Sequence, residues 1–195
     1  MTTPPRIAPL PVSALRPEWE ATLTRIPGSG LKGEGSPHHV MGTLMHAPAT
    51  LGAFLDYWVT SKETMAFSLR EQELLILRMG VLYRSEYVWR HHVPVAREFG
   101  VAEATLEALR TGDLASLGDG RDRAVVELTD ELVNHRTIGD EAWRLWASKL
   151  SPLEVIELIG LVAQYVLFAL TNNAFCVALE RPMLAVPGLE DSLAP

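Results

Sequence analysis

The sequence predicts an all-α protein, and three observations support this fold class. From His38 onward, apolar residues recur at helical spacing almost throughout. The same region contains no run of alternating polar and β-branched residues long enough for a strand. Capping boxes and glycines divide the pattern into segments of helical length. We therefore expect helices at 38–46, 49–64, 69–83, 86–99, 102–110, 120–135, 139–149 and 152–179.

The limits of these helices have local causes. Ser68–Glu71 and Ser151–Glu154 have the capping-box pattern, in which a serine caps the helix and a glutamate three residues later reaches back to it. Pro152 stands at a first helical position, where its missing N–H costs nothing. Gly100 and Gly112 are expected to end two helices as left-handed residues.

The domain organisation follows from length and composition. The chain has 195 residues, of which 48% are hydrophobic and 21% charged, as in one soluble globular domain of ordinary size. Proline and glycine are concentrated near the N-terminus, where the glycine-rich piece 28–35 indicates a flexible loop. We expect an N-terminal arm over 1–36, a helical domain over 37–183 and a C-terminal tail over 184–195.

Charge and hydropathy limit the partners. The net charge of −7 gives no electrostatic reason to bind nucleic acid or an anionic membrane. No basic start followed by an apolar run is present at the N-terminus, so we expect no signal peptide. Glu154, Glu157 and Gln164 interrupt the most apolar stretch, 153–170, so we do not expect it to cross a bilayer. These features predict a soluble cytoplasmic protein.

Cysteine and histidine usage argues against several kinds of site. The single cysteine, Cys176, excludes an internal disulfide and a zinc site with two thiolates from one chain. We expect it inside the last helix as a small buried hydrophobic residue. The histidines show no metal-ligand spacing, and no glycine-rich nucleotide motif occurs. We therefore expect neither a metal nor a cofactor.

The helix expected over 69–83 carries two candidate residues on an otherwise apolar segment. Glu73 shares a face with Ile76 and Leu77, where a carboxylate must find a partner or be protonated. Alternatively, Glu73 lies in the first turn of the helix, where the helix dipole stabilises its charge and water solvates it. Arg78 lies deeper in the apolar run, as a structural ion-pair partner or as a clamp for a substrate carboxylate.

The helix expected over 86–99 contains two adjacent histidines that are not equivalent. His92 lies in the middle of an apolar stripe, while His91 falls on the flank. His92 is therefore either a core histidine bonded to a neighbour or the functional histidine of a pocket. The face opposite the stripe is expected to carry Glu86, Arg90, Val93 and Arg97.

Three segments together resemble the carboxymuconolactone decarboxylase family, within the alkylhydroperoxidase D-like superfamily. They are the run from Leu69 to Arg78, the run Ser85-Glu-Tyr-Val-Trp-Arg-His-His92, and the run from Ala96 to Val101. The resemblance covers about 60–180. It implies an alkylhydroperoxidase D-like helical bundle that assembles as dimers, trimers or hexamers.

The resemblance also implies residue roles. In the peroxidase branch a glutamate and a histidine relay protons to the thiols of a CxxC pair. The glutamate matches Glu73 and the histidine matches His92, whereas Ser85 and Val88 occupy the cysteine positions. The decarboxylase branch lacks the thiols and keeps the Glu-Tyr-x-Trp-x-x-His pattern. The expected catalytic residues are thus His92, Glu73, Tyr87 and Glu86, and the expected substrate-binding residues are Arg78, Trp89 and Ser85.

Three functions remain open at this point. The first is a cofactor-independent acid/base lyase, a decarboxylase or isomerase acting on a small carboxylated lactone or ring compound. The second is a non-catalytic, oligomeric small-molecule-binding protein of the same fold. Peroxidase chemistry is disfavoured because Ser85 and Val88 replace the thiols it needs.

Overall fold

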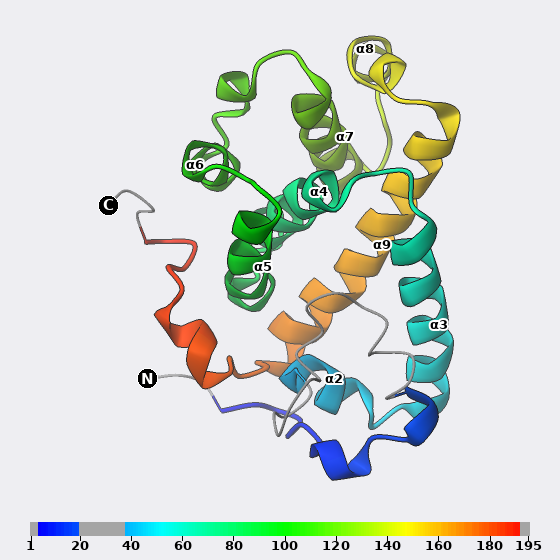
Figure 1. Ribbon diagram of the computed structural model, residues 1–195, viewed down its shortest axis with the longest axis vertical. Helices are drawn as coiled ribbons and strands as arrows, with labels where there is room; N and C mark the ends of the chain where they lie inside the picture. Colours follow the sequence, from blue (N-terminus) through cyan, green and yellow to red (C-terminus); the bar gives the residue numbers. More distant parts are fainter. Residues whose placement is uncertain (1–3, 20–37, 192–195) are drawn as a thin grey trace. The chain divides into compact units, whose positions relative to one another are not determined.

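The computed structural model describes residues 4–19 and 38–191, and every regular element within them is a helix (Figure 1). This confirms the predicted all-α fold class. The α-helices are α2 (His39–Leu44), α3 (Pro48–Thr64), α4 (Leu69–Leu82), α5 (Glu86–Glu98), α6 (Glu103–Thr111), α7 (Arg121–His135), α8 (Asp140–Leu145) and α9 (Pro152–Phe175). Short 3-10 helices are η1 (Val12–Ala14), η2 (Leu114–Leu117), η3 (Ala147–Lys149) and η4 (Arg181–Ala185).

The chain divides into two compact units. One combines Met1–Met65 with Thr171–Arg181, and the other combines Ala66–Leu170 with Pro182–Pro195. These divisions fall at different positions from those expected at 36 and 183. The glycine-rich piece 28–35 lies outside the described residues.

The predicted caps are confirmed. Ser68 Oγ accepts a hydrogen bond from the Glu71 backbone N–H, and the Glu71 carboxylate accepts one from the Ser68 N–H at 2.9 Å. Ser151 and Glu154 form the same reciprocal pair at the start of α9. Gly100 and Gly112 have φ values of 82° and 80°, in the left-handed region that glycine adopts without a steric cost.

The final helix is shorter than expected, and Cys176 lies outside it. Helix α9 ends at Phe175, and Cys176 takes φ 52°, so the predictions of a helix to 179 and of Cys176 within it are wrong. The N–H of Val177 reaches back to the Asn172 carbonyl at 3.0 Å, the six-to-one bond of a Schellman motif. No glycine marks this end, and Cys176 is partly exposed rather than buried.

The segment 139–149 is also not one continuous helix. It breaks at Trp146, whose φ of −114° and ψ of −48° separate α8 from η3. Another difference concerns α5, where Val93 is fully buried although it was expected on the outer face. Helix α5 therefore has neighbours on more than one side.

The second unit holds the core that positions α5. Side chains from α4, α5, α6 and α7 pack together there, including Leu74, Leu77, Trp89, Val93, Leu106, Leu109 and Val126. Helices α4 and α5 approach closely at Gly80, where an added Cβ would lie 3.2 Å from the Trp89 backbone nitrogen. This is tighter than most Cβ contacts, so a side chain at residue 80 would require the backbone of α5 to move by a few tenths of an ångström.

Helix α9 is both a core helix and an exposed apolar surface. Leu158 and Leu161 are fully buried, whereas Leu153 and Ile156 are 57% and 68% exposed. By length and composition alone, α9 could cross a membrane, with a mean hydropathy of 1.9 in its most apolar window. A buried core helix of a soluble protein meets the same criterion, so the expectation that this segment does not span a bilayer stays a prediction.

Candidate active site

The centre of the candidate site is a carboxylate–imidazole pair that joins α4 to α5. His92 Nδ1 lies 2.7 Å from Glu73 Oε2, the distance of a charge-assisted hydrogen bond. The capping box at Ser68 fixes the start of α4. The close helix crossing at Gly80 brings His92 on α5 within reach of Glu73.

Glu73 is the buried member of the pair, and His92 the accessible one. Their side chains are 4% and 21% exposed, respectively. Glu73 is therefore not a solvated glutamate stabilised only by the start of its helix, which was the alternative explanation. A carboxylate at this depth needs a partner, and His92 supplies it.

A third side chain, Tyr165 of α9, completes the group. Its hydroxyl lies 3.3 Å from His92 Nε2, and the two rings meet edge to face with centroids 5.4 Å apart. Both ring nitrogens of His92 therefore have polar neighbours. Sequence reasoning missed Tyr165 because it looks like one more large apolar residue in the most hydrophobic helix of the chain.

Tyr165 keeps its proton over a wide range of pH. Burial raises the pKa of its phenol well above the usual value of 10, and the nearby charge of Glu73 raises it further. The side chain is only 2% exposed. It is consequently a neutral hydroxyl beside His92, able to donate or accept a hydrogen bond.

Ser85 and Trp89 lie on the same face of α5 as His92, at intervals of four and three residues. Both side chains are fully buried. The Trp89 indole N–H donates to the Pro187 carbonyl at 3.1 Å and packs in the core, so its contacts here are structural. Within the part of the chain that the structure describes, Ser85 Oγ has no hydrogen-bond partner and does not cap α5.

Glu86 and Tyr87 have neighbours other than His92. The Glu86 carboxylate accepts hydrogen bonds from Arg90 Nε at 2.8 Å and from the Leu189 backbone N–H at 3.0 Å. Tyr87 stacks on His91, with ring centroids 4.1 Å apart. Glu86 therefore ties α5 to the C-terminal segment, and the structure does not bring it to the Glu73–His92 pair.

Arg78 is held by an internal ion pair. Its Nε and Nη2 both lie 2.6 Å from the carboxylate oxygens of Asp130, and its Nη1 donates to the Leu109 carbonyl at 2.7 Å. The guanidinium thus joins α4 to α6 and α7. This geometry favours the structural salt bridge over the substrate clamp.

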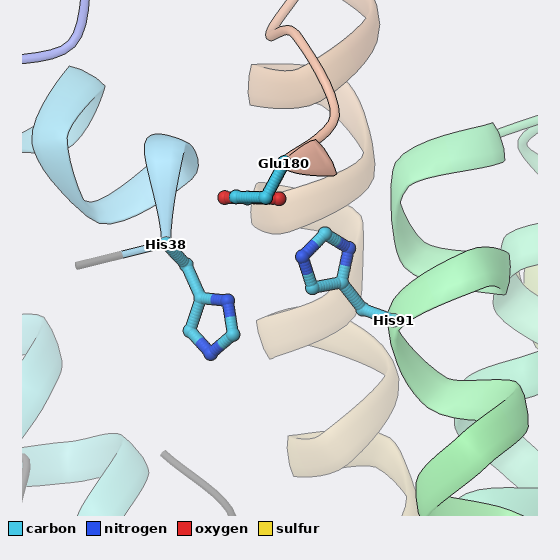
Figure 2. A group of neighbouring side chains, drawn as sticks. All are labelled: His38, His91 and Glu180. Carbon is cyan, nitrogen blue, oxygen red and sulfur yellow. The ribbon is translucent and has the colours of Figure 1, made fainter. Parts of the chain in front are cut away.

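Figure 2 shows two possible metal ligands of one unit, His38 and Glu180. Their ligand atoms lie within 4.8 Å of one another. His91 projects from α5 in the other unit, where its Nδ1 lies 2.9 Å from the Tyr87 carbonyl. Two donors from one unit do not make the four-ligand arrangement of a structural zinc site.

The fold and the carboxylate–imidazole pair define a class: an all-helical protein in which a buried glutamate and a histidine join two packed helices. Residues 48–131 match the model of the carboxymuconolactone decarboxylase family. This is the family that the three sequence segments resemble, and the match covers 84 of the 195 residues. A search of curated protein sequences finds no significant match.

Solved structures share this fold at low sequence identity. The apo debrominase Bmp8 superposes with a TM-score of 0.76 and 15% identity over 92% of this chain and 94% of that one. A cysteine-to-alanine variant of Bmp8 with 2,3,4-tribromopyrrole gives 0.77 and 14%, over 95% of this chain and 97% of that one. An uncharacterised peroxidase-related protein from Ralstonia eutropha superposes with a TM-score of 0.77 and 13% identity, over 94% of this chain and 97% of that one.

Proposed function

We propose that the protein is a cofactor-independent acid/base lyase, a decarboxylase or isomerase that acts on a small carboxylated lactone or ring compound. The observation that carries this proposal is the 2.7 Å contact between His92 and the buried Glu73. A carboxylate that orients an imidazole is the usual arrangement of a general acid/base. The family of residues 48–131 supports the same class of reaction.

The proposed decarboxylation needs proton transfer and charge stabilisation only. The bond between the ring carbon and the substrate carboxylate breaks, CO₂ leaves, and the electron pair moves into the conjugated carbonyl as an enolate. His92 takes a proton from water, and the resulting imidazolium donates it to carbon; the hydroxide that water leaves combines with the CO₂ as bicarbonate. Glu73 orients the ring and stabilises its positive charge.

A thiol route is not proposed for this chain. Bmp8 is described as a debrominase, and a variant lacking one of its cysteines was crystallised with a brominated pyrrole. Here the only cysteine of the sequence, Cys176, follows the end of α9, and α5 contains none. Thiol peroxidase and related chemistry need a thiolate nucleophile.

Incubation with a panel of carboxylated lactones and β-keto acids tests the proposal. We expect the purified protein to release CO₂ from at least one compound, or to isomerise it. His92→Gln should lower turnover by roughly 10²- to 10⁴-fold, the usual contribution of a general acid/base, while helical content by circular dichroism stays unchanged.

Two results would contradict the proposal. A panel without turnover across physiological pH would favour the alternative of a non-catalytic small-molecule-binding protein. Full turnover by the folded His92→Gln variant would remove His92 from the chemistry.

A further inference from the structure

The Tyr165 hydroxyl stands beside Nε2, the ring nitrogen of His92 that does not contact Glu73. We propose that Tyr165 is a positioning residue that donates a hydrogen bond to the basic Nε2 of resting His92, while Glu73 holds the proton on Nδ1. The contact at 3.3 Å between the Tyr165 hydroxyl and His92 Nε2 is the observation behind this inference. It extends the proposed function but is tested without any substrate.

The contact with Glu73 determines that Nδ1 of His92 carries a proton. An ionised carboxylate can only accept hydrogen bonds, so at 2.7 Å the Nδ1 atom of His92 must donate. A neutral imidazole has one donor and one acceptor nitrogen. Once Nδ1 holds the proton, Nε2 presents a lone pair.

The contact with Tyr165 provides a hydrogen-bond donor for the lone pair of Nε2. The phenol is buried and retains its proton, so it can donate to that lone pair. A ring that accepts at one nitrogen and donates at the other is held in one tautomer and one orientation. The edge-to-face contact of the two rings, with an interplanar angle of 77°, restricts the orientation further.

This arrangement sets the order of the proposed chemistry. The hydrogen bond between the Tyr165 hydroxyl and His92 Nε2 first breaks. His92 then acts as a base at Nε2. In an isomerisation Nε2 removes a proton from the substrate. In a decarboxylation it takes a proton from water, and the hydroxide combines with the released CO₂ as bicarbonate. In both cases the same proton is then delivered to carbon, and His92 returns to its neutral form.

Nitrogen NMR of the substrate-free, ¹⁵N-histidine-labelled protein at mildly alkaline pH tests the inference. We expect His92 to show a protonated Nδ1 and an unprotonated, hydrogen-bonded Nε2. In Tyr165→Phe the Nε2 resonance should move downfield by several ppm, because it loses a donor, while Nδ1 stays protonated. Tyr57→Phe removes a hydroxyl from an exposed tyrosine of α3 and should change neither resonance.

A protonated Nε2 in the parent protein, alone or together with Nδ1, would overturn the inference. So would an unchanged Nε2 resonance in a folded Tyr165→Phe. If that variant does not fold, the Nε2 resonance of the parent decides, because a hydrogen-bonded lone pair resonates several ppm upfield of an unbonded one, and an unbonded Nε2 would overturn the inference. Because no turnover is measured, a negative result here is distinct from failure of the proposed reaction.

Discussion

Ser85 shows at the scale of one residue how this site differs from thiol-bearing relatives. It takes the place of the first cysteine of the CxxC pair that the resemblance implies, and its hydroxyl is fully buried. Burying a hydroxyl without a partner costs free energy, and such groups in native proteins call for an explanation. Binding of a substrate oxygen would supply the missing hydrogen bond.

Replacement of Ser85 by alanine separates this explanation from a structural one. Because Ser85 does not cap α5, Ser85→Ala should leave the free energy of unfolding unchanged within about 0.5 kcal/mol, or raise it. Ser68→Ala is the matched control, since Ser68 caps α4 and its loss should cost about 1 kcal/mol. Urea unfolding measures both variants, and an equal loss in Ser85→Ala would show that its hydroxyl stabilises the fold.

Residue-scale prediction from the sequence worked where spacing on a single helix decides the outcome. The stripe on α5 singled out His92, and the apolar surroundings of Glu73 indicated that its carboxylate needs a partner. The structure brings these two residues together. Tyr165 could not be found in this way because 73 residues separate it from His92 and only the packing of α9 makes them neighbours.

At the scale of elements, an ion-pair network connects three helices. Arg121 at the start of α7 contacts Glu71 of α4 at 2.9 Å and Glu154 of α9 at 2.7 Å. Hydrogen bonds from Arg121, and then from Ser151, lower the pKa of Glu154 to about 2. Burial opposes ionisation of Glu71, but hydrogen bonds from Ser68 and Arg121 outweigh it and lower its pKa also.

This network predicts a stability loss in acid. A carboxylate whose pKa is lower in the folded state stabilises the fold fully above its unfolded pKa of about 4.5, and this contribution is lost as the pH falls toward about 2. Glu154→Gln should therefore reduce the difference in unfolding free energy between pH 5 and pH 2. Urea unfolding at several pH values measures this difference, with the exposed Glu141→Gln as control. An unchanged pH dependence in Glu154→Gln would contradict the assignment.

The element limits were predictable where side chains mark them. Ser68, Ser151, Gly100 and Gly112 carry recognisable capping chemistry, and the helices begin or end where these residues indicate. The end of α9 was missed because its left-handed residue is Cys176. Glycine usually occupies such a position, and it is the residue by which a helix end of this kind is recognised in a sequence. The break at Trp146 likewise has no proline or glycine to announce it.

At the scale of the whole molecule, the sequence predicted the all-α fold class, and its resemblance to the carboxymuconolactone decarboxylase family agrees with the match over residues 48–131. It did not predict that the C-terminal segment is part of the second unit. Arg110 donates to the Leu189 carbonyl at 3.1 Å, and Arg90 donates to the Leu184 carbonyl at 3.2 Å. Val186 and Leu189 pack against the core. A short tail interrupted by prolines and a glycine gives no periodic signal, so only its tertiary contacts show that it is structural.

The central claim is that Glu73 and His92 act as one acid/base unit. Turnover of the best substrate from the panel should be compared among the parent protein, Glu73→Gln, His92→Gln and the double variant. Residues that act together are strongly non-additive, so we expect the double variant to be no slower than His92→Gln alone. Independent effects that multiply in the double variant, or parental turnover in His92→Gln, would contradict the claim.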